Sequence, residues 1–414
     1  MLVVLYYPTS KANNGLDAYV FACNLVEAAI DAGAEANLIT LQSKLNPLMP
    51  SDSVYNLLRM TWGFLHTPVH ESVYGKFQAF LKELKKQLKI KGEPTDWLNP
   101  PDVFFNIAGG RYLGRDIVAA SLGFPIPDAP KERWESTSDL LNKFWWTPQS
   151  IKDKRKPVSR PILTETLPLE TYVRTLDVDY KEVARVNAKL KALLEEASTV
   201  RIIGKPVEVN GQQFHTELEI DIEGKKVPTD DGVFTKGNNY LNLPAGEAYL
   251  TPENVNGTLV ADGSVTLDKS YLLEKPLVFK FKEGKFNLNW MFCADRSLEQ
   301  KIHRTINEYK EYLRNLKQKK VLSEKVIRTY EKNFYRVGEL GIGTNPNARV
   351  SKWLIESEKV LGTIHIALGS GYEPDRRSVH HEDMVAGWKT PLTVDAIIDN
   401  KPVRILDKGK LVVG

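Results

Sequence analysis

The chain has 414 residues, of which 42% are apolar and 26% charged, and its formal net charge is +4. This length exceeds what one hydrophobic core usually serves, so two domains are expected in a protein whose composition is typical of soluble globular chains. The small net charge gives little electrostatic attraction to nucleic acid or to an anionic membrane, and neither is predicted as a partner.

The cysteines and the amino terminus indicate the compartment. Cys23 and Cys293 are too few and too far apart for a disulfide framework or a thiolate metal site, which points to a reducing environment. The first residues, MLVVLYYPTS, have no basic region before their short apolar run, and no apolar run in the chain approaches the roughly eighteen residues of a membrane span. The sequence therefore predicts a cytoplasmic protein.

The first part of the chain has the order of a β-α-β unit. LVVLYY (Leu2 to Tyr7) and ANLITL predict strands, and DAYVFACNLVEAAIDAGA between them predicts a helix that ends at Gly33. A further apolar run, DVFFNIA, predicts another strand, while GGRYLG after it lacks the GxGxxG order of a dinucleotide site and predicts an ordinary turn. Residues 1–175 are predicted to form an α/β domain with a largely parallel sheet.

A connection and a helix are predicted next. Between Trp145 and Thr175 the chain is rich in proline and basic residues, which predicts an extended connection rather than a core element. The following segment, DYKEVARVNAKLKALLEEA, predicts a linker helix within residues 176–199. Its apolar side is expected to contain Val183, Val186, Leu190, Leu193 and Ala197.

From Val200 onward, short alternating segments separated by EG, DG and NG predict antiparallel hairpins and a second, β-rich domain over residues 200–414. The overall expectation is an α/β domain followed by an α+β domain. A long charged helical stretch, Ser297 to Arg336, interrupts the hairpins. Its basic excess from Lys301 onward predicts a solvated helix face rather than a binding surface.

Four segments of the second domain offer carboxylates and imidazoles, which are the ligands that divalent cations prefer at hydrolytic sites. The candidates are Glu247 in LPAGEAY, Glu339 in VGELGIGTNP, His365 in GTIHIALG, and His381 with Asp383 in SVHHEDM. Each segment alone is a weak signal, because a lone histidine in an apolar strand is more often a core residue than a ligand. The zinc signatures HExxH and CxxC do not occur in the chain.

The segment SVHHEDM contains two alternative pairs. Residues two apart on a strand point to the same face, so His381 and Asp383 can bind one metal while His380 and Glu382 point away. The spacing alone does not exclude the opposite choice.

Together, NLPAGEAY, GELGIGTNP, GTIHIALG followed by GY, and the pattern S-x-x-H-x-D resemble the M29 family of metallo-aminopeptidases, the thermophilic aminopeptidase T group. The four motifs occur in family order, and the resemblance covers roughly the last half of the chain. It implies a metallopeptidase domain that removes amino-terminal residues from peptides with a free N-terminus, and it implies a homodimer.

Carried onto this chain, the resemblance implies that two divalent metal ions (zinc, cobalt, manganese or magnesium) are bound by Glu247, Glu339, His365, His381 and Asp383. Glu339 is expected to bridge the metals or to assist proton transfer. Tyr372 falls on an active-site tyrosine of the family and is expected to donate a hydrogen bond to the oxyanion of the reaction. The position of Ser378 selects His381 over its neighbour.

A different class of enzyme would use part of the same set. A ring-cleaving dioxygenase family acting on dihydroxypyridines has a similar carboxy-terminal fold and binds a single iron through two histidines and one aspartate, which His365, His381 and Asp383 would supply. Such a site has no need for Glu247 and Glu339, whereas a two-metal hydrolase needs carboxylates to bridge the ions and balance their charge. The two glutamates favour the peptidase. A non-catalytic α/β protein, the third alternative, leaves this set of side chains unexplained.

Overall fold

The structure, a computed structural model, describes residues 2–7, 15–42, 103–108, 160–234, 241–267, 269–319 and 324–413. The chain divides into two compact units, Met1–Leu169 and Glu170–Gly414. The segment GGRYLG and residues 145–159 of the expected connection lie outside the described residues. Among the described helices, none is both long enough and apolar enough to cross a membrane.

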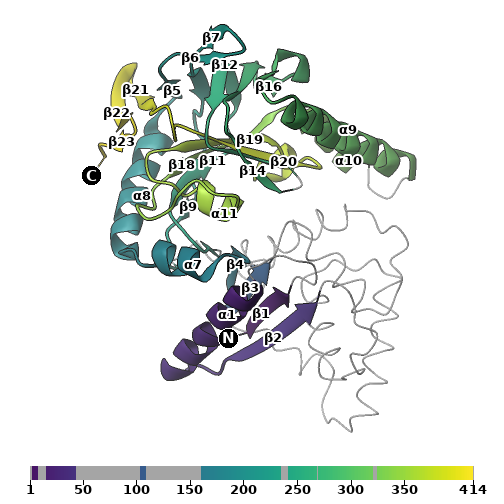
Figure 1. The fold of residues 1–414 in the computed structure, drawn as a ribbon. Coiled ribbons are helices and arrows are strands. Elements are labelled where there is room, and N and C mark those ends of the chain that lie inside the picture. Colours follow the sequence, from purple (N-terminus) through teal and green to yellow (C-terminus); the bar gives the residue numbers. More distant parts are fainter. Residues whose placement is uncertain are drawn as a thin grey trace. The chain divides into compact units, whose positions relative to one another are not determined.

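The first unit contains four described strands that pair in parallel (Figure 1). Strand β1 (Leu2–Tyr7) lies between β2 (Asn37–Gln42) and β3 (Val103–Ala108), and β3 also pairs with β4 (Arg160–Glu165). Helix α1 (Gly15–Asp31) packs on β1 and β2 and ends before Gly33, whose φ of 83° suits glycine. Since residues 43–102 and 109–159 are not described, the architecture of the whole domain stays a prediction.

Strand β4 corrects one expectation. Its residues fall in the stretch expected to be an extended connection, but RPILTE pairs along its length with β3 and buries Ile162 and Thr164. The prolines and basic residues around this segment disfavour a strand. The backbone pairing with β3 and the burial of the apolar side chains favour one more strongly.

The second unit is built on two antiparallel sheets within the described residues. The seven-stranded sheet contains, in spatial order, β14 (Ser270–Leu272), β13 (Ser264–Thr266), β20 (His381–Ala386), β19 (Ile364–Gly369), β18 (Val337–Gly343), β11 (Glu247–Leu250) and β9 (Thr229–Asp230). The nine-stranded sheet contains β16 (Lys285–Phe286), β15 (Leu277–Lys282), β12 (Asn254–Ala261), β8 (Glu217–Asp221), β5 (Thr199–Ile203), β21 (Thr393–Ile398), β22 (Lys401–Asp407) and β23 (Lys410–Leu411), with β17 (Phe292–Cys293) paired to β15.

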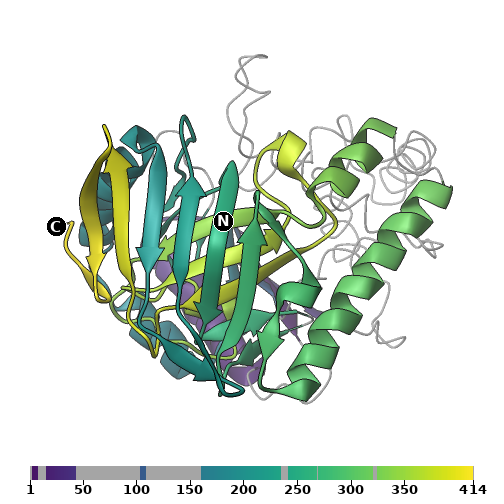
Figure 2. The ribbon, with the colours of Figure 1, turned by 90° about the horizontal axis from the view of Figure 1, so that it is seen from above.

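The two sheets are stacked, and Figure 2 shows the strands of the larger sheet lying across those of the smaller one. Alternate residues of each strand point into the space between them, which is the main hydrophobic core. From the smaller sheet this core receives Leu340, Ile366 and Met384, and from the larger sheet it receives Ile220, Phe279 and Val394. One face of the smaller sheet thus packs in the core, and the opposite face carries the side chains of the candidate site.

Helices cover the edges of the stack. Helix α8 (Tyr180–Glu196) is capped by Asp179, whose side chain accepts from the backbone of Lys181, and it contacts β9, β11 and β21. Its buried residues are Val183, Asn187, Leu190 and Leu194. The expected apolar side is largely confirmed, since Val186 also packs against the main core and Ala197 is buried in it. Leu193 is the exception, because it is only half-buried while Asn187 and Leu194 take inner positions.

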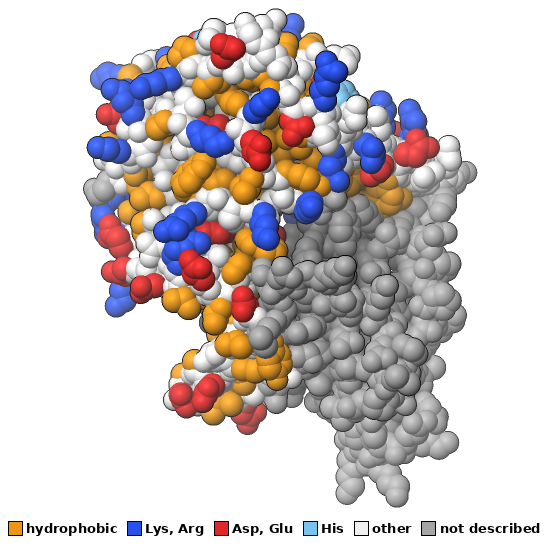
Figure 3. All heavy atoms as spheres, viewed as in Figure 1, with side chains coloured by type: hydrophobic (Ala, Val, Ile, Leu, Met, Phe, Trp, Pro, Cys, Tyr) orange, Lys and Arg blue, Asp and Glu red, His pale blue; other side chains and the backbone are white. Residues whose placement is uncertain are grey.

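The charged stretch forms α9 (Arg296–Lys319) and α10 (Glu324–Asn333), which pack against each other beside the sheets (Figures 1 and 2). Helix α9 inserts Ile302, Ile306 and Leu313 into the main core. Arg314 and Arg328 are exposed. On the face shown in Figure 3, basic and acidic side chains of the second unit are interspersed.

The remaining elements are short. They are α7 (Leu169–Leu176), α11 (Leu354–Ser357), the 3-10 helices η2 (Leu288–Trp290) and η3 (Pro374–Arg376), the hairpin of β6 (Val207–Val209) and β7 (Gln212–Phe214), and β10 (Leu241–Asn242).

Candidate metal centre

Four adjacent strands of the seven-stranded sheet carry the side chains expected to bind metal. Glu247 begins β11, Glu339 lies in β18, His365 lies in β19, and His381 and Asp383 lie in β20. Paired residues of an antiparallel sheet point to the same face, as do residues two apart on one strand. The strand register therefore places all five on the face opposite the main core.

Small residues make room between these side chains. Gly343 pairs with Glu247, Gly341 with His365, and Ala367 with both Glu339 and Asp383. The imidazole of His365 lies directly over β18, since a Cβ on Gly341 would be only 2.0 Å from Cε1 of that ring. The glycines of VGELGIG thus serve the geometry of the site.

His380, which precedes β20, and Glu382, within it, point away from the candidate ligands. His380 is buried with its ring stacked on Tyr309 and its Nε2 lying 2.7 Å from the carbonyl oxygen of Phe334. Glu382 is buried on the opposite face from its neighbour Asp383. The structure brings His381 and Asp383 to the site and places the alternative pair outside it.

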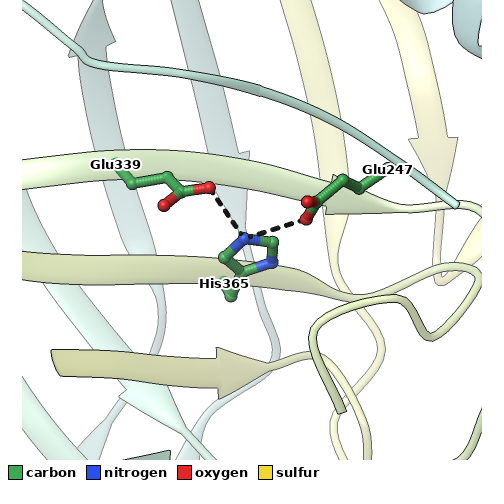
Figure 4. A group of neighbouring side chains, drawn as sticks. All are labelled: Glu247, Glu339 and His365. Atoms are coloured by element: carbon green, nitrogen blue, oxygen red, sulfur yellow. Dashed lines mark hydrogen bonds and ion pairs between the residues drawn. The ribbon is translucent and has the colours of Figure 1, made fainter. Parts of the chain in front are cut away.

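The ligand atoms form two groups that share one glutamate. In the first, Nε2 of His365 lies 3.2 Å from Oε1 of Glu339 and 3.4 Å from Oε2 of Glu247 (Figure 4). In the second, Nε2 of His381 lies 3.1 Å from Oε2 of Glu339 and 3.4 Å from Oδ1 of Asp383. Within each group the ligand atoms lie within 4.8 Å of one another.

The site is buried on one side and accessible on the other. Glu247, Glu339 and His365 are almost fully buried, whereas 31% of the side chain of His381 is exposed. Nδ1 of His381 lies 2.7 Å from the carbonyl oxygen of Ser370, to which it donates when protonated, so that Nε2 turns its lone pair toward the carboxylates. The site is therefore accessible from the side of His381.

Tyr372 lies on the same accessible side. Its hydroxyl donates a hydrogen bond of 2.6 Å to Oε2 of Glu339, and its ring packs against Tyr249 with ring centroids 4.7 Å apart. The backbone amide of Tyr372 is fixed by the hydroxyl of Thr251 at 2.9 Å. Burial and the charge of Glu339 raise the pKa of the phenol well above its usual value, so Tyr372 is a hydrogen-bond donor at neutral pH.

The charges in the site are strongly coupled. Burial alone would lower the pKa of His365, but the hydrogen bond and charge of Glu339 and the charge of Glu247 raise it to about 9. Burial would raise the pKa of Glu339, but hydrogen bonds from His365 and His381 hold it well below the usual range. Burial raises the pKa of Glu247 to about 8, although the charge of Lys359 opposes the shift.

Sequence reasoning missed three charged residues behind Glu247. Nζ of the fully buried Lys359 lies 2.5 Å from Oε1 of Glu247, 2.8 Å from Oε1 of Glu358 and 3.6 Å from Oδ2 of Asp230. Glu358 also joins His365 and Asp383 in a third group of ligand atoms within 4.8 Å. The segment ESEKVLG contains no pattern that indicates these contacts, which only the tertiary fold reveals.

The residues of the centre fit divalent metal ions. Oε2 of Glu247 is buried, accepts no hydrogen bond from any described residue, and points at His365. A buried carboxylate oxygen without a donor is costly unless a cation completes its surroundings. Three carboxylates and two imidazoles form the hard and borderline donor set that zinc, cobalt and manganese accept. The described residues could therefore hold a metal at this face of the sheet.

Comparison with known proteins adds little. Searches with family models and against curated proteins found no match. Among solved structures, "Structure of 2,5-dihydroxypridine Dioxygenase from Pseudomonas putida KT2440" is similar, with a TM-score of 0.49 and 12% sequence identity over 100% of this chain and 92% of that chain. A likeness at this level carries no argument about fold or activity.

Proposed function

We propose that the protein is a metal-dependent aminopeptidase with a two-metal centre on the face of the seven-stranded sheet opposite the main core. The observation that carries the proposal is the position of Glu339, whose two oxygens face two separate groups of ligands. A carboxylate shared in this way is what a pair of metals needs as a bridge. The motif resemblance supplies the reaction class.

One ion would be held by Glu247, Glu339 and His365, and the other by Glu339, His381 and Asp383. The three carboxylates would offset most of the charge of two divalent ions, which we expect to be zinc, cobalt, manganese or magnesium. When bound, such ions lower the pKa of a coordinated water from about 15.7 toward roughly 7 and so supply a hydroxide nucleophile at neutral pH.

The surrounding side chains have separate roles in this proposal. Glu339 would hold both ions rather than accept the proton, because both of its oxygens face ligand side chains and its pKa is held far below neutral. Glu358 is the better acceptor, since 13% of its side chain is exposed and its carboxylate lies beside His365 and Asp383. Tyr372 orients Glu339 through its hydroxyl in the structure, and in the reaction the same hydroxyl would turn from Glu339 to donate its proton to the developing oxyanion.

The mononuclear dioxygenase is the weaker candidate on geometry. It needs His365, His381 and Asp383 around one ion, but none of the three groups of ligand atoms found in the described residues contains both histidines. Each histidine instead faces Glu339, which the single-iron site would not use.

Further parts of the proposal concern the setting of the enzyme. We expect peptides with a free N-terminus as substrates, whose terminal amine would be available as a ligand for one of the ions. We also expect a cytoplasmic homodimer in which residues 1–175 form an α/β domain with a largely parallel sheet. Size-exclusion chromatography with light scattering tests the dimer.

The proposed function is tested by metal analysis beside an assay on dipeptides and leucyl-anilide. We expect about two metals per chain, release of amino-terminal residues that a chelator abolishes, and loss of activity in Glu247→Gln. The matched control is Glu208→Gln, which changes an exposed carboxylate on β6 and should behave as wild type. One iron per chain with oxygen-dependent ring cleavage and no peptide hydrolysis would contradict the proposal.

A further inference from the structure

We propose that Lys359 is a positioning residue that holds Glu247 as a one-oxygen ligand of a single member of the metal pair. The proposal rests on the two-metal centre proposed above. Nζ of Lys359 contacts Oε1 of Glu247 at 2.5 Å, while Oε2 of the same carboxylate faces Nε2 of His365 at 3.4 Å. One oxygen is thus fixed by the ammonium and the other is presented to the site.

The fold explains how a lysine reaches this place. The connection between β18 and β19 turns back over the ligand face after α11, and the amide of Asn345 donates to the carbonyl oxygen of Lys359 at 2.8 Å. The segment of Lys359 and Val360 lies directly on Gly343, where an added Cβ would be 2.2 Å from the carbonyl oxygen of Val360. Because Gly343 pairs with Glu247, this close approach brings the ammonium beside the carboxylate.

The ammonium is held from several sides. Lys359 is fully buried and also faces Glu358 at 2.8 Å and Asp230 at 3.6 Å. A fully buried ammonium persists only when carboxylates surround it, so its position is tightly determined. A carboxylate bonded to such a fixed cation cannot rotate to offer both oxygens to a metal, and this sets the coordination at Glu247.

The contact is specific to one side of the centre. The carboxylates in ion pairs with Lys359 are Asp230, Glu247 and Glu358, in the part of the chain that the structure describes. Of the five proposed ligands, Glu247 is the one paired with Lys359, whereas Asp383 is reached only through Glu358, so the influence of Lys359 should fall mainly on the ion at Glu247 and His365. A residue that served only the stability of the fold would not distinguish the two ions.

The experiment is a titration of the metal-free protein with Mn²⁺ alone, followed by calorimetry, in the wild type and in Lys359→Met. The wild type should bind two ions per chain. Lys359→Met should bind one ion about 10–100-fold more weakly and the other unchanged, as expected for loss of a group that orients a ligand. The control, Lys191→Met, removes a lysine whose ion pair with Glu195 is exposed and should match the wild type. Circular dichroism establishes folding.

If Lys359→Met does not fold, Lys359→Arg takes its place, because it keeps a buried cation but moves it relative to Glu247, and it should weaken the same ion alone. A second comparison separates the effect on Glu247 from a general effect of removing the lysine. In Glu247→Gln the partner of the lysine is already neutral, so adding Lys359→Met should change Mn²⁺ affinity by less than about twofold. Equal weakening of both ions, unchanged affinity in Lys359→Met, or a further large loss in the double variant would overturn the role of Lys359. Fewer than two ions in the wild type would instead refute the two-metal centre itself.

Discussion

The substitution Gly341→Ala adds one methyl group where the imidazole of His365 crosses β18. The new Cβ would lie 2.0 Å from Cε1 and 2.1 Å from Nε2 of the ring. These separations are about 1.5 Å shorter than the roughly 3.5 Å of a carbon contact, so the ring must leave its position between Glu339 and Glu247. We expect overpacking to lower the free energy of unfolding by about 1–3 kcal/mol.

The effect on metal binding should be larger than the effect on stability. Because His365 is displaced from one of the two groups of ligands, affinity for the ion beside Glu247 should fall by more than about 100-fold, beyond the loss of an orienting partner. Calorimetry with Mn²⁺ measures the affinity, and guanidinium unfolding measures the stability.

The control for this variant is Gly211→Ala. Gly211 has a φ of 78°, and a Cβ added there would meet no heavy atom within 4 Å, so alanine costs about 1–2 kcal/mol through backbone strain without touching the site. It should bind both ions normally. If Gly341→Ala also bound two ions with wild-type affinity, the placement of His365 as a ligand would be refuted.

Three further outcomes are expected. The pKa is raised to about 9 for His365 and to about 8 for Glu247 in the metal-free protein, so both hold a proton at pH 7 and binding of the ion at these ligands must expel up to two protons. The apparent affinity should therefore rise with pH by up to about a hundredfold per unit near pH 7 and less steeply toward pH 9. Calorimetry in two buffers of different ionisation enthalpy measures the release, and a pH-independent affinity would contradict the assignment. Tyr372→Phe should lower kcat by about 10²–10³-fold with both metals retained, and unchanged kcat would exclude the tyrosine from catalysis. Glu358→Gln should lower kcat by about 10²–10⁴-fold, again with two metals bound; loss of a metal instead would make Glu358 a ligand rather than the proton acceptor.

The residues brought together at the centre were largely foreseeable from sequence. The two-residue spacing of His381 and Asp383 is enough to put both side chains on one face of a strand, whichever strands lie beside it. Glu247, Glu339 and His365 were each a weak signal alone, and it was the resemblance of their four motifs, in order, to the M29 family that selected them together. The register of β18, β19 and β20 could not be derived from the sequence. This register places Ala367 between Glu339 and Asp383 and so puts the two carboxylates at the same level of the sheet.

Lys359 and Asn187 show why other features could not be foreseen. Lys359 is buried only because its loop folds back onto a glycine of β18, a contact without local signal. Asn187 takes an inner position on α8 because its amide donates to Asp231 and its carbonyl accepts from Thr344, which is 157 residues later in the chain. Helical periodicity weighs only apolar residues and so did not include Asn187 among the expected inner positions.

The central claim is that Glu339 joins two metals in one centre. Electron paramagnetic resonance of the protein loaded with two equivalents of Mn²⁺ tests it directly, because ions bridged at roughly 3.5–4 Å are magnetically coupled. We expect the six-line spectrum of isolated Mn²⁺ to be replaced by a coupled signal at full loading, and Glu339→Gln to abolish that signal. A spectrum of isolated Mn²⁺ at every loading, saturating at one ion per chain, would contradict the account.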